Sequence, residues 1–333
     1  MRYPIVCLLY CTTKCDHNCV HCLVRDAKPV TLDYDKAAKN LSEFKNLGGR
    51  YVDFTGGNPL LMPGLEDLLR VSRKLGLISS LTLSGPQIRA KGEKIFSLPD
   101  ILRISIEGDE NYHNGNRGQN CYSFIKEGLE MAKRRGRGQT QLIFTVIPGS
   151  QGNLNRDQFA HVLQIAREFQ VIVNINPIFN IGVLSGEELQ DLKWFARQAD
   201  VQCSRGKLRF ILRGGNNTCR PTCRAAHNTI TISADNELIL PCYHHRAERI
   251  SLPEGLKVAL DSPIRKNLLS RDGRFDFCEG CSIWCYIIPS WFSHVFDRVA
   301  VWEHGLSGLQ PLRDAVLRYC GRFHHRPYPD LSF

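Results

Sequence analysis

The chain has 333 residues, and its 43 Lys and Arg against 33 Asp and Glu give a formal net charge of +10. Hydrophobic residues make up 43% and charged residues 23%, a balance typical of a globular protein with a buried core. The 14 cysteines, about 4% of the residues, are too few for a small disulfide-stapled secreted scaffold, which carries ~8–10%. No apolar run reaches about 18 residues, so no membrane span is expected. The N-terminal run leads into cysteines instead of a cleavage site, which predicts a cytoplasmic protein whose cysteines are metal ligands or free thiols.

Strand-like and helix-like segments alternate from residue 5 to about residue 199. The predicted strands are short runs rich in β-branched or aromatic residues: Ile5–Tyr10, Tyr51–Thr55, Ile78–Leu83, Leu102–Ile106, Gln141–Ile147 and Val171–Ile175. The predicted helices are Tyr34–Leu47, Gly64–Leu75, Ile88–Leu98, Ser123–Arg135, Asp157–Phe169 and Gly186–Ala199. Six βα units in a row predict an α/β fold with a parallel sheet covered by helices. A full barrel needs eight units, so a partial TIM-like (β/α)6 barrel is the closer description.

The pattern changes after residue 200. Gly206–Arg213 is predicted to be a strand, and Thr229–Ser233 with Glu237–Leu240 form a hairpin pattern around Ala234-Asp235-Asn236. The rest is irregular, with cysteines at positions 219, 223, 242, 278, 281 and 285. We therefore expect two domains, a barrel over residues 1–200 and a small cysteine-rich β-hairpin domain over residues 201–333.

The first cysteine cluster, Cys15, Cys19 and Cys22, directly follows the first predicted strand. In an α/β barrel, active sites are assembled at that end of the strands. Three thiolates at this spacing can hold three irons of a [4Fe–4S] cube and leave the fourth iron open for an external ligand. From spacing alone, a structural zinc site that also uses His17 and His21 is the alternative.

This Cys-x3-Cys-x2-Cys loop resembles the hallmark of the radical S-adenosylmethionine (SAM) superfamily, with His21 where an aromatic residue is common. After the second predicted strand, Gly56-Gly57-Asn58-Pro59 resembles the family's Gly-Gly-Glu-Pro turn. The resemblance implies that this turn binds SAM, because glycines let backbone carbonyls approach its ammonium group closely. Asn58 departs from the usual acidic residue, which leaves backbone contacts but no side-chain charge there.

Two weaker motifs follow the fourth predicted strand. Ser105-Ile106-Glu107-Gly108 and His113-x3-Arg117-Gly118 both resemble family patterns. The resemblance implies that Ser105 and Arg117 contact the SAM carboxylate, which a guanidinium can bind bidentately, and that Ser84 lies on the ribose side. The other polar residues at strand ends that could face the barrel cavity are Glu107, Asn174 and Asn176.

The second cysteine cluster surrounds the predicted hairpin. Cys223 and Cys242 flank it, Cys278-x2-Cys281 follows, and Cys285 comes after three more residues. This pattern resembles the Twitch domain, a short form of the SPASM domain, in which a hairpin and a Cys-x2-Cys bind one auxiliary [4Fe–4S] cluster. The implied ligands are Cys223, Cys242, Cys278 and Cys281, with Cys285 and Cys219 as substitutes. Structural zinc is again the alternative, because four thiolates suit either metal.

The resemblance implies an enzyme that cleaves SAM to a 5′-deoxyadenosyl radical, which abstracts a hydrogen atom from its substrate. The electron would come from an external donor such as flavodoxin or ferredoxin, and the auxiliary cluster would aid an oxidation. The substrate is a small molecule or a peptide; the cysteine motif begins at residue 15, which favours a small molecule or a peptide presented by a partner.

Two other functions remain open at this point. The adenosyl radical could add to an unsaturated, lipid-like substrate, or the chain could be a non-enzymatic, zinc-stapled binding protein. The net charge and the run at residues 133–137 could suggest a nucleic acid or an anionic lipid. No nucleic-acid-binding motif accompanies them, so we predict a solvated helix end and no nucleic-acid partner.

Overall fold

The computed structural model describes residues 3–147, 154–177, 184–202 and 205–291, so most of the C-terminal segment lies outside the described residues. Within them, ten strands form one sheet in the order β10-β9-β8-β1-β2-β3-β4-β5-β6-β7. The strands are β1 (Val6–Thr12), β2 (Tyr51–Gly56), β3 (Ile78–Leu83), β4 (Ile101–Ile106), β5 (Gln139–Val146), β6 (Ile172–Pro177), β7 (Val201–Gln202), β8 (Thr229–Ile232), β9 (Glu237–Leu240) and β10 (Glu248–Ser251). Neighbouring strands from β8 through β1 to β7 pair in parallel.

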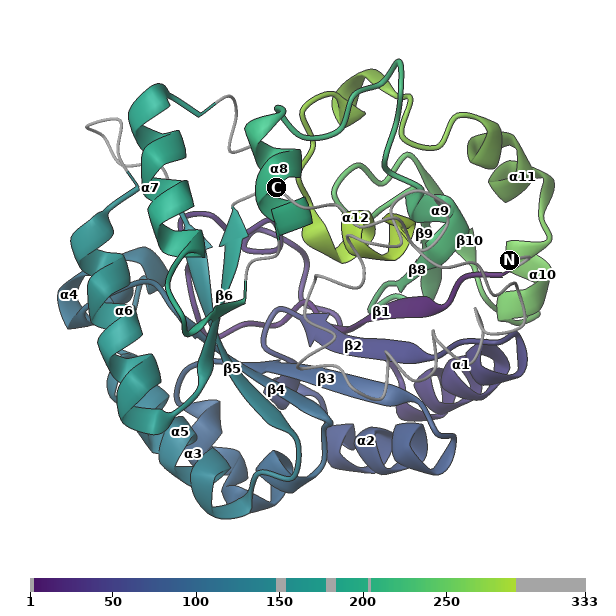
Figure 1. Cartoon of the computed structure of the whole chain (residues 1–333). Coiled ribbons are helices and arrows are strands. Elements are labelled where there is room, and N and C mark those ends of the chain that lie inside the picture. The colour runs from purple at the N-terminus through teal and green to yellow at the C-terminus, as the bar shows by residue number, and fades with distance from the viewer. Residues whose placement is uncertain (1–2, 148–153, 178–183, 203–204, 292–333) are drawn as a thin grey trace, which may run out of the picture.

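The strands β1 to β6 curve around an interior, and helices cover their outer side (Figure 1). The helices are α1 (Tyr34–Asn46), α2 (Leu65–Lys74), α3 (Gln87–Lys91), α4 (Glu110–Arg117), α5 (Ser123–Arg135), α6 (Arg156–Phe169), α7 (Gly186–Ala196), α8 (Arg205–Leu212), α9 (Ala225–Asn228), α10 (Leu256–Leu260), α11 (Pro263–Ser270) and α12 (Trp284–Trp291). Short 3-10 turns span Pro59–Leu61, Glu93–Ser97 and Asp276–Cys278. The six predicted strands and the alternation with helices are confirmed, with strand ends shifted by at most two residues.

Two predicted elements differ from the structure. The predicted helix Ile88–Leu98 is split into α3 and a 3-10 turn at Gly92, whose φ of 64° lies outside the helical region. The predicted strand Gly206–Arg213 is wrong, because this segment forms α8. Its buried residues Lys207, Phe210 and Ile211 recur at the i, i+3, i+4 spacing of a helix, and this spacing outweighs the strand preference of Phe and Ile.

The predicted hairpin is confirmed as β8 and β9, with Asn236 in the turn at a φ of 61°. β8 also pairs in parallel with β1, from Val6 opposite Thr229 to Leu9 opposite Ile232. The hairpin therefore continues the barrel sheet at its β1 edge. Figure 1 shows α12 on the open side of the curved sheet, between α8 and β8, where Trp284 packs edge-on against Phe210. The domain boundary near residue 200 stays a prediction.

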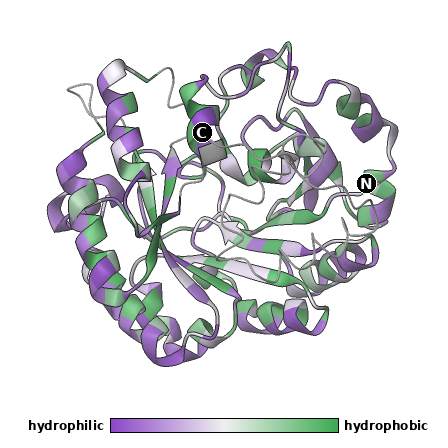
Figure 2. Ribbon diagram, viewed as in Figure 1, coloured by the Kyte–Doolittle hydropathy of each residue, from purple (hydrophilic) through white to green (hydrophobic). Residues whose placement is uncertain are grey.

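Side chains on the two faces of the barrel strands differ sharply in polarity, since successive residues of a strand point to opposite faces. On the outer face, apolar residues such as Leu9, Phe54 and Leu81 pack in a core beneath the helices. The outer sides of α5 and α6 are hydrophilic (Figure 2). On the inner face the central positions are polar: Asp53, Ser80, Arg103, Gln141 and Asn174. A complete TIM barrel fills this space with Val, Ile and Leu, so the interior here is a chamber and not a core.

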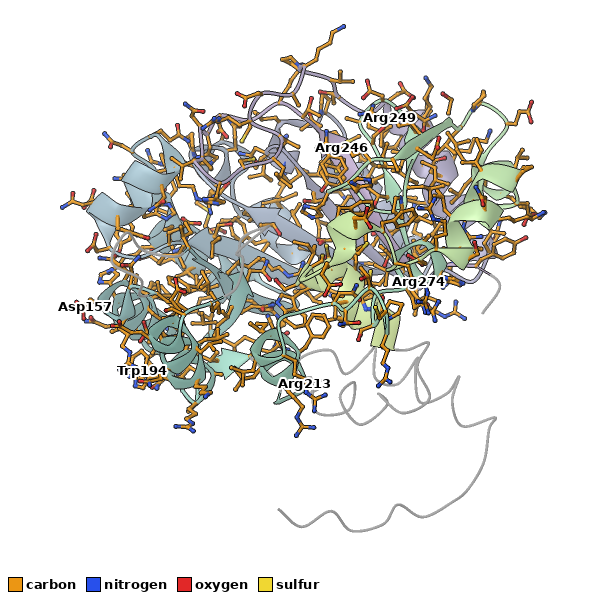
Figure 3. All side chains as sticks on the ribbon, turned by 90° about the horizontal axis from the view of Figure 1, so that it is seen from above. Asp157, Trp194, Arg213, Arg246, Arg249 and Arg274 are labelled. Carbon is orange, nitrogen blue, oxygen red and sulfur yellow. The ribbon has the colours of Figure 1, made fainter. Side chains whose placement is uncertain are left out.

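Surface charge is spread over the outside of the molecule. The predicted solvated helix end is confirmed, because residues 133–137 are exposed and both Arg134 and Arg135 pair with Glu93 at 2.9 Å. Figure 3 shows Arg213 and Arg274 with their side chains pointing away from the ribbon. No helix among the described residues is both long enough and apolar enough to cross a membrane.

Candidate functional site

A cavity of about 450 Å³ occupies the interior of the barrel. The inner faces of β1 to β6 supply most of its wall, and the rest comes from α4, β7, α8, α12, the cysteine loop and the turns after β2 and β3. Its volume lies in the range of small-molecule sites. Ser84, Ser105 and Arg117 line it. Of the three strand-end residues expected to face the cavity, Asn174 and Asn176 line it as well, whereas Glu107 is not part of its wall.

The first cysteine cluster lies on a loop that leaves β1 at Thr12. The base of this loop is closed by hydrogen bonds, with Thr12 Oγ1 donating to Val30 O at 2.8 Å and Val30 N donating to Thr13 Oγ1 at 2.8 Å. Burial raises the pKa of Cys15 to about 11, and the nearby thiols of Cys19 and Cys22 add to this effect. The structure therefore brings the three predicted cysteines together at the carboxyl end of the barrel.

The cysteine loop fits an iron–sulfur cluster in its donor atoms. Asp16 Oδ2, His17 Nε2 and His21 Nδ1 are buried without a hydrogen-bond partner. The cysteine loop thus carries buried polar atoms that the protein itself does not satisfy. Within the described part of the chain, no three His, Cys, Asp or Glu side chains gather as they would around a single metal ion. In a [4Fe–4S] cube, by contrast, each thiolate binds its own iron.

The glycine turn packs directly against the start of the cysteine loop. Gly57 N donates to Thr12 O at 2.7 Å, and a Cβ on Gly56 would lie 2.2 Å from the same oxygen. A Cβ on Gly57 would lie 2.2 Å from Lys14 O. The two glycines are therefore required for the contact between β2 and the loop, which is a different physical reason from an approach to SAM. Both glycines and Pro59 line the cavity, and their contact with SAM stays a prediction.

The side chain of Asn58 links the cysteine loop, the end of β3 and the 3-10 turn after β2. It is fully buried, and its Nδ2 donates to Asp16 Oδ1 at 2.8 Å and to Ser84 O at 3.2 Å. Its Oδ1 accepts from Leu60 N at 3.2 Å, which caps the 3-10 turn. An acidic residue here would face the carboxylate of Asp16, so the departure from the family pattern has a local electrostatic reason. Asn58 is not part of the cavity wall.

Arg117 lies at the end of α4, a helix that the sequence analysis does not predict. Its Nε donates to Glu107 Oε2 at 2.9 Å and its Nη2 to Glu107 Oε1, while Nη1 lies 3.7 Å from Cys19 Sγ. His113 Nδ1 lies 2.8 Å from the same carboxylate. Burial alone would raise the pKa of Glu107, but Arg117 and His113 hold it well below its usual range.

The Glu107 pair changes what Arg117 can offer to SAM. Arg117 Nε and Nη2 already donate to the Glu107 carboxylate. A contact between Arg117 and the SAM carboxylate would therefore have to use Nη1. The role of Arg117 in binding SAM stays a prediction. Glu107 holds the Arg117 guanidinium in place through two hydrogen bonds and does not itself line the cavity.

The second cysteine cluster is brought together from three separate segments. Burial raises the pKa of Cys223 well above its ordinary value, and the thiols of Cys281, Cys278 and Cys242 lie close enough to raise it further. Burial likewise raises the pKa of Cys242 and of Cys278 to about 12. This cysteine-rich region fits an auxiliary cluster. Of the two substitutes, Cys285 is on α12 and lines the barrel cavity, whereas Cys219 is exposed.

Asn216 holds the loops of the second cluster in place. Its Oδ1 accepts from Cys223 N and Thr222 N at 2.9 Å, and its Nδ2 donates to Gly273 O at 2.9 Å and Cys278 O at 3.1 Å. Its own backbone nitrogen donates to Cys281 O at 2.9 Å. No local sequence pattern singles out Asn216, since its partners lie far along the chain.

Sequence comparison gives one family match and a set of relatives. The family model of the Radical SAM superfamily matches residues 9–164. A GTP 3′,8-cyclase of Chlorobaculum tepidum is 36% identical over 275 residues, which cover 74% of this chain and 80% of that protein. A GTP 3′,8-cyclase of Pseudomonas putida (strain W619) is 25% identical over 187 residues, and the match spans only about half of it, 54%.

Comparison with solved structures supports the same architecture. Streptococcus suis SuiB bound to S-adenosylmethionine has a TM-score of 0.62 at 15% identity, covering 81% of this chain and 68% of that one. The structure of anSMEcpe with bound AdoMet has a TM-score of 0.63 at 16% identity, covering 89% and 98%. At these identities the likeness is one of fold. Together with the parallel sheet of Figure 1, it confirms the predicted partial barrel with a cysteine-rich C-terminal region.

Proposed function

This chain belongs to the radical SAM superfamily, and on that premise we propose that it cleaves SAM reductively and abstracts a hydrogen atom from a substrate held in the barrel cavity. Members of the family use a [4Fe–4S] cluster and SAM. The observation that carries the proposal is the junction between the cysteine loop and the cavity. His21 of the loop lines the cavity, and Arg117 lines it while contacting Cys19.

Different residues of the chain would bind the cluster, SAM and the substrate. Cys15, Cys19 and Cys22 would hold the cluster, and the turn at residues 56–59 with Ser84, Ser105 and Arg117 would hold SAM. When bound, these cofactors supply the one-electron cleavage of SAM to a 5′-deoxyadenosyl radical. The barrel wall orients the substrate, and α12 covers the open side of the barrel and limits access of water.

The C-terminal region would carry the auxiliary cluster on Cys223, Cys242, Cys278 and Cys281. Cys285 lies in the cavity wall, and the thiols of Cys242 and Cys281 are near enough to raise its pKa further after burial has raised it. This second site therefore adjoins the substrate chamber. An auxiliary cluster there could accept an electron from the substrate, with an external donor supplying the electron for the first cluster.

The GTP 3′,8-cyclase relatives make a nucleotide the second candidate substrate, favoured by the 36% identity over most of the chain. The cavity wall offers little to a triphosphate, because its cations already have partners within the protein. Arg103 pairs with Asp53, Arg117 with Glu107, and Lys207 Nζ donates to Ile175 O. A neutral small molecule or a peptide segment matches this wall better.

The test uses protein reconstituted with iron and sulfide under anaerobic conditions. We expect about eight irons per chain if both clusters form, and 5′-deoxyadenosine from SAM after reduction. A triple Cys15, Cys19 and Cys22→Ala variant should lose this product and keep the auxiliary irons. Cluster-loaded protein that forms no 5′-deoxyadenosine would refute hydrogen abstraction. An adenosylated product would instead support addition of the adenosyl radical to an unsaturated substrate. Zinc without iron would support a non-enzymatic, zinc-stapled binding protein.

A further inference from the structure

A network of polar side chains holds Arg103 at the inner end of the cavity. Arg103 Nη1 donates to Asp53 Oδ1 at 3.2 Å and Nη2 donates to Tyr51 OH at 2.8 Å. Tyr51 OH donates to Ser80 Oγ at 2.7 Å, and Ser80 in turn donates to Asp53. The network compensates the charge of Arg103 and orients its guanidinium. Its Nε is buried and has no hydrogen-bond partner.

Gln141 places an unpaired acceptor beside this donor. The register of β4 and β5 sets Gln141 directly opposite Arg103, and both line the cavity. Gln141 is only 2% exposed, and its Nε2 donates to Gln139 Oε1 at 2.7 Å, but its Oε1 has no partner. Because adjacent strands lie about 4.8 Å apart, the side chains of Arg103 and Gln141 leave neighbouring backbone positions toward the same cavity. Buried polar atoms are normally paired, which makes two adjacent exceptions on a cavity wall informative.

We propose that Arg103 Nε and Gln141 Oε1 together bind a neutral amide-type group of the substrate, a carboxamide or lactam. Its carbonyl oxygen would accept from Arg103 Nε, and its N–H would donate to Gln141 Oε1. A neutral group is favoured over an anion because Asp53 already balances the charge of Arg103. This inference rests on the proposed function, since it assigns the substrate class of the same cavity.

The position of the two atoms along the strands fits a substrate site. Arg103 precedes Ser105 by two residues on β4, which places it about 7 Å deeper in the barrel than the level expected for SAM. Ile143, the next inward residue on β5, lies directly opposite Ser105 and lines the wall at that level. An amide held at the inner end would therefore direct an apolar substituent past Ile143 toward the cysteine loop.

The test measures binding of two matched lactams to the reconstituted protein with SAM present. 2-Pyrrolidinone carries both the donor and the acceptor, whereas N-methyl-2-pyrrolidinone lacks the donor and acetate is the anionic comparison. Ligand-observed NMR titration should show 2-pyrrolidinone binding about fivefold tighter than its N-methyl analogue. Gln141→Met should abolish this preference, and the matched Gln198→Met, outside the cavity wall, should retain it.

The comparison of the lactams on the unaltered protein needs no variant, so a folding defect in Gln141→Met does not weaken the test. Equal binding of both lactams, binding of neither, or tighter binding of acetate overturns the amide site. If 5′-deoxyadenosine forms but the lactam preference is missing, only this inference fails. If the preference is present but cluster-loaded protein forms no 5′-deoxyadenosine, the proposed function fails and the amide site stands.

Discussion

Glu107 shows how a single buried charge organises the edge of the cavity. Its carboxylate is completely buried and is shared between Arg117 and His113, and Arg117 in turn contacts Cys19. Removing one member of a buried ion pair leaves the other charge without compensation, which is more costly than losing an exposed pair. The position of Arg117 beside the cluster loop therefore depends on a residue that touches neither the cavity nor the cysteines.

We expect Glu107→Gln to lower the free energy of unfolding of the apo-protein by roughly 3 kcal/mol at pH 7. The folded-state pKa of Glu107 is depressed, so its ionised form stabilises the protein above the unfolded-state value of about 4.3. This stabilisation is lost as the pH falls from there toward the folded-state pKa. Urea denaturation from pH 7 to pH 4 should show a constant difference between the two proteins that begins to shrink only near pH 4.3.

Glu254→Gln is the control, since Glu254 is exposed and its substitution should change stability little at any pH in this range. A difference for Glu107→Gln that grows as the pH falls would contradict the assigned ion pair.

At the scale of elements, the cysteine loop is held by close backbone contacts with the turn after β2. Gly56, the first residue of this turn, has a φ of 137°, which L side chains rarely adopt, and its α-carbon faces Thr12 O. Spacing within the chain predicts where this turn falls. The reason for its glycines is visible only once β1 and β2 are paired, with Tyr10 opposite Thr55.

Two Gly→Ala substitutions should have opposite effects on stability. Gly56→Ala places a Cβ 2.2 Å from Thr12 O at a strained φ, so we expect a lower melting temperature and loss of iron from the first cluster. Gly186→Ala, at the first residue of α7 with nothing within 4 Å of its added Cβ, should be neutral or raise stability by up to about 1 kcal/mol. Thermal denaturation and iron analysis of both variants provide the check. Equal behaviour of the two would refute the steric role of Gly56.

At the scale of the whole molecule, the sheet joins the barrel to the hairpin through β1 and β8. The first cysteine loop leaves one end of β1, and Cys242 follows the hairpin that pairs with β1. Asn216 then ties the segment before Cys223 to the loop of Cys278 and Cys281. The two cysteine clusters are thus positioned by one continuous framework around the cavity.

Asn216→Ala should remove the second cluster selectively. The variant loses the side-chain hydrogen bonds to both cysteine loops, so we expect about four of the about eight irons to be lost, with the first cluster and 5′-deoxyadenosine formation retained. Asn217→Ala, at the exposed neighbouring position, should keep all irons. A full iron content in Asn216→Ala would show that the loops do not need this residue.

Local spacing was enough to predict the alternation of strands and helices, the cysteine loop after the first strand, the glycine turn and the hairpin. These patterns are set by neighbours within a few residues, so they can be read without knowing the fold. The segment that forms α8 was predicted as a strand because Phe and Ile favour strands. Which distant side chains meet depends on the folded arrangement of the strands and helices. Arg117 pairs with Glu107, Asn58 with Asp16, and Arg103 stands opposite Gln141 because strand register and packing bring together residues that no local pattern links.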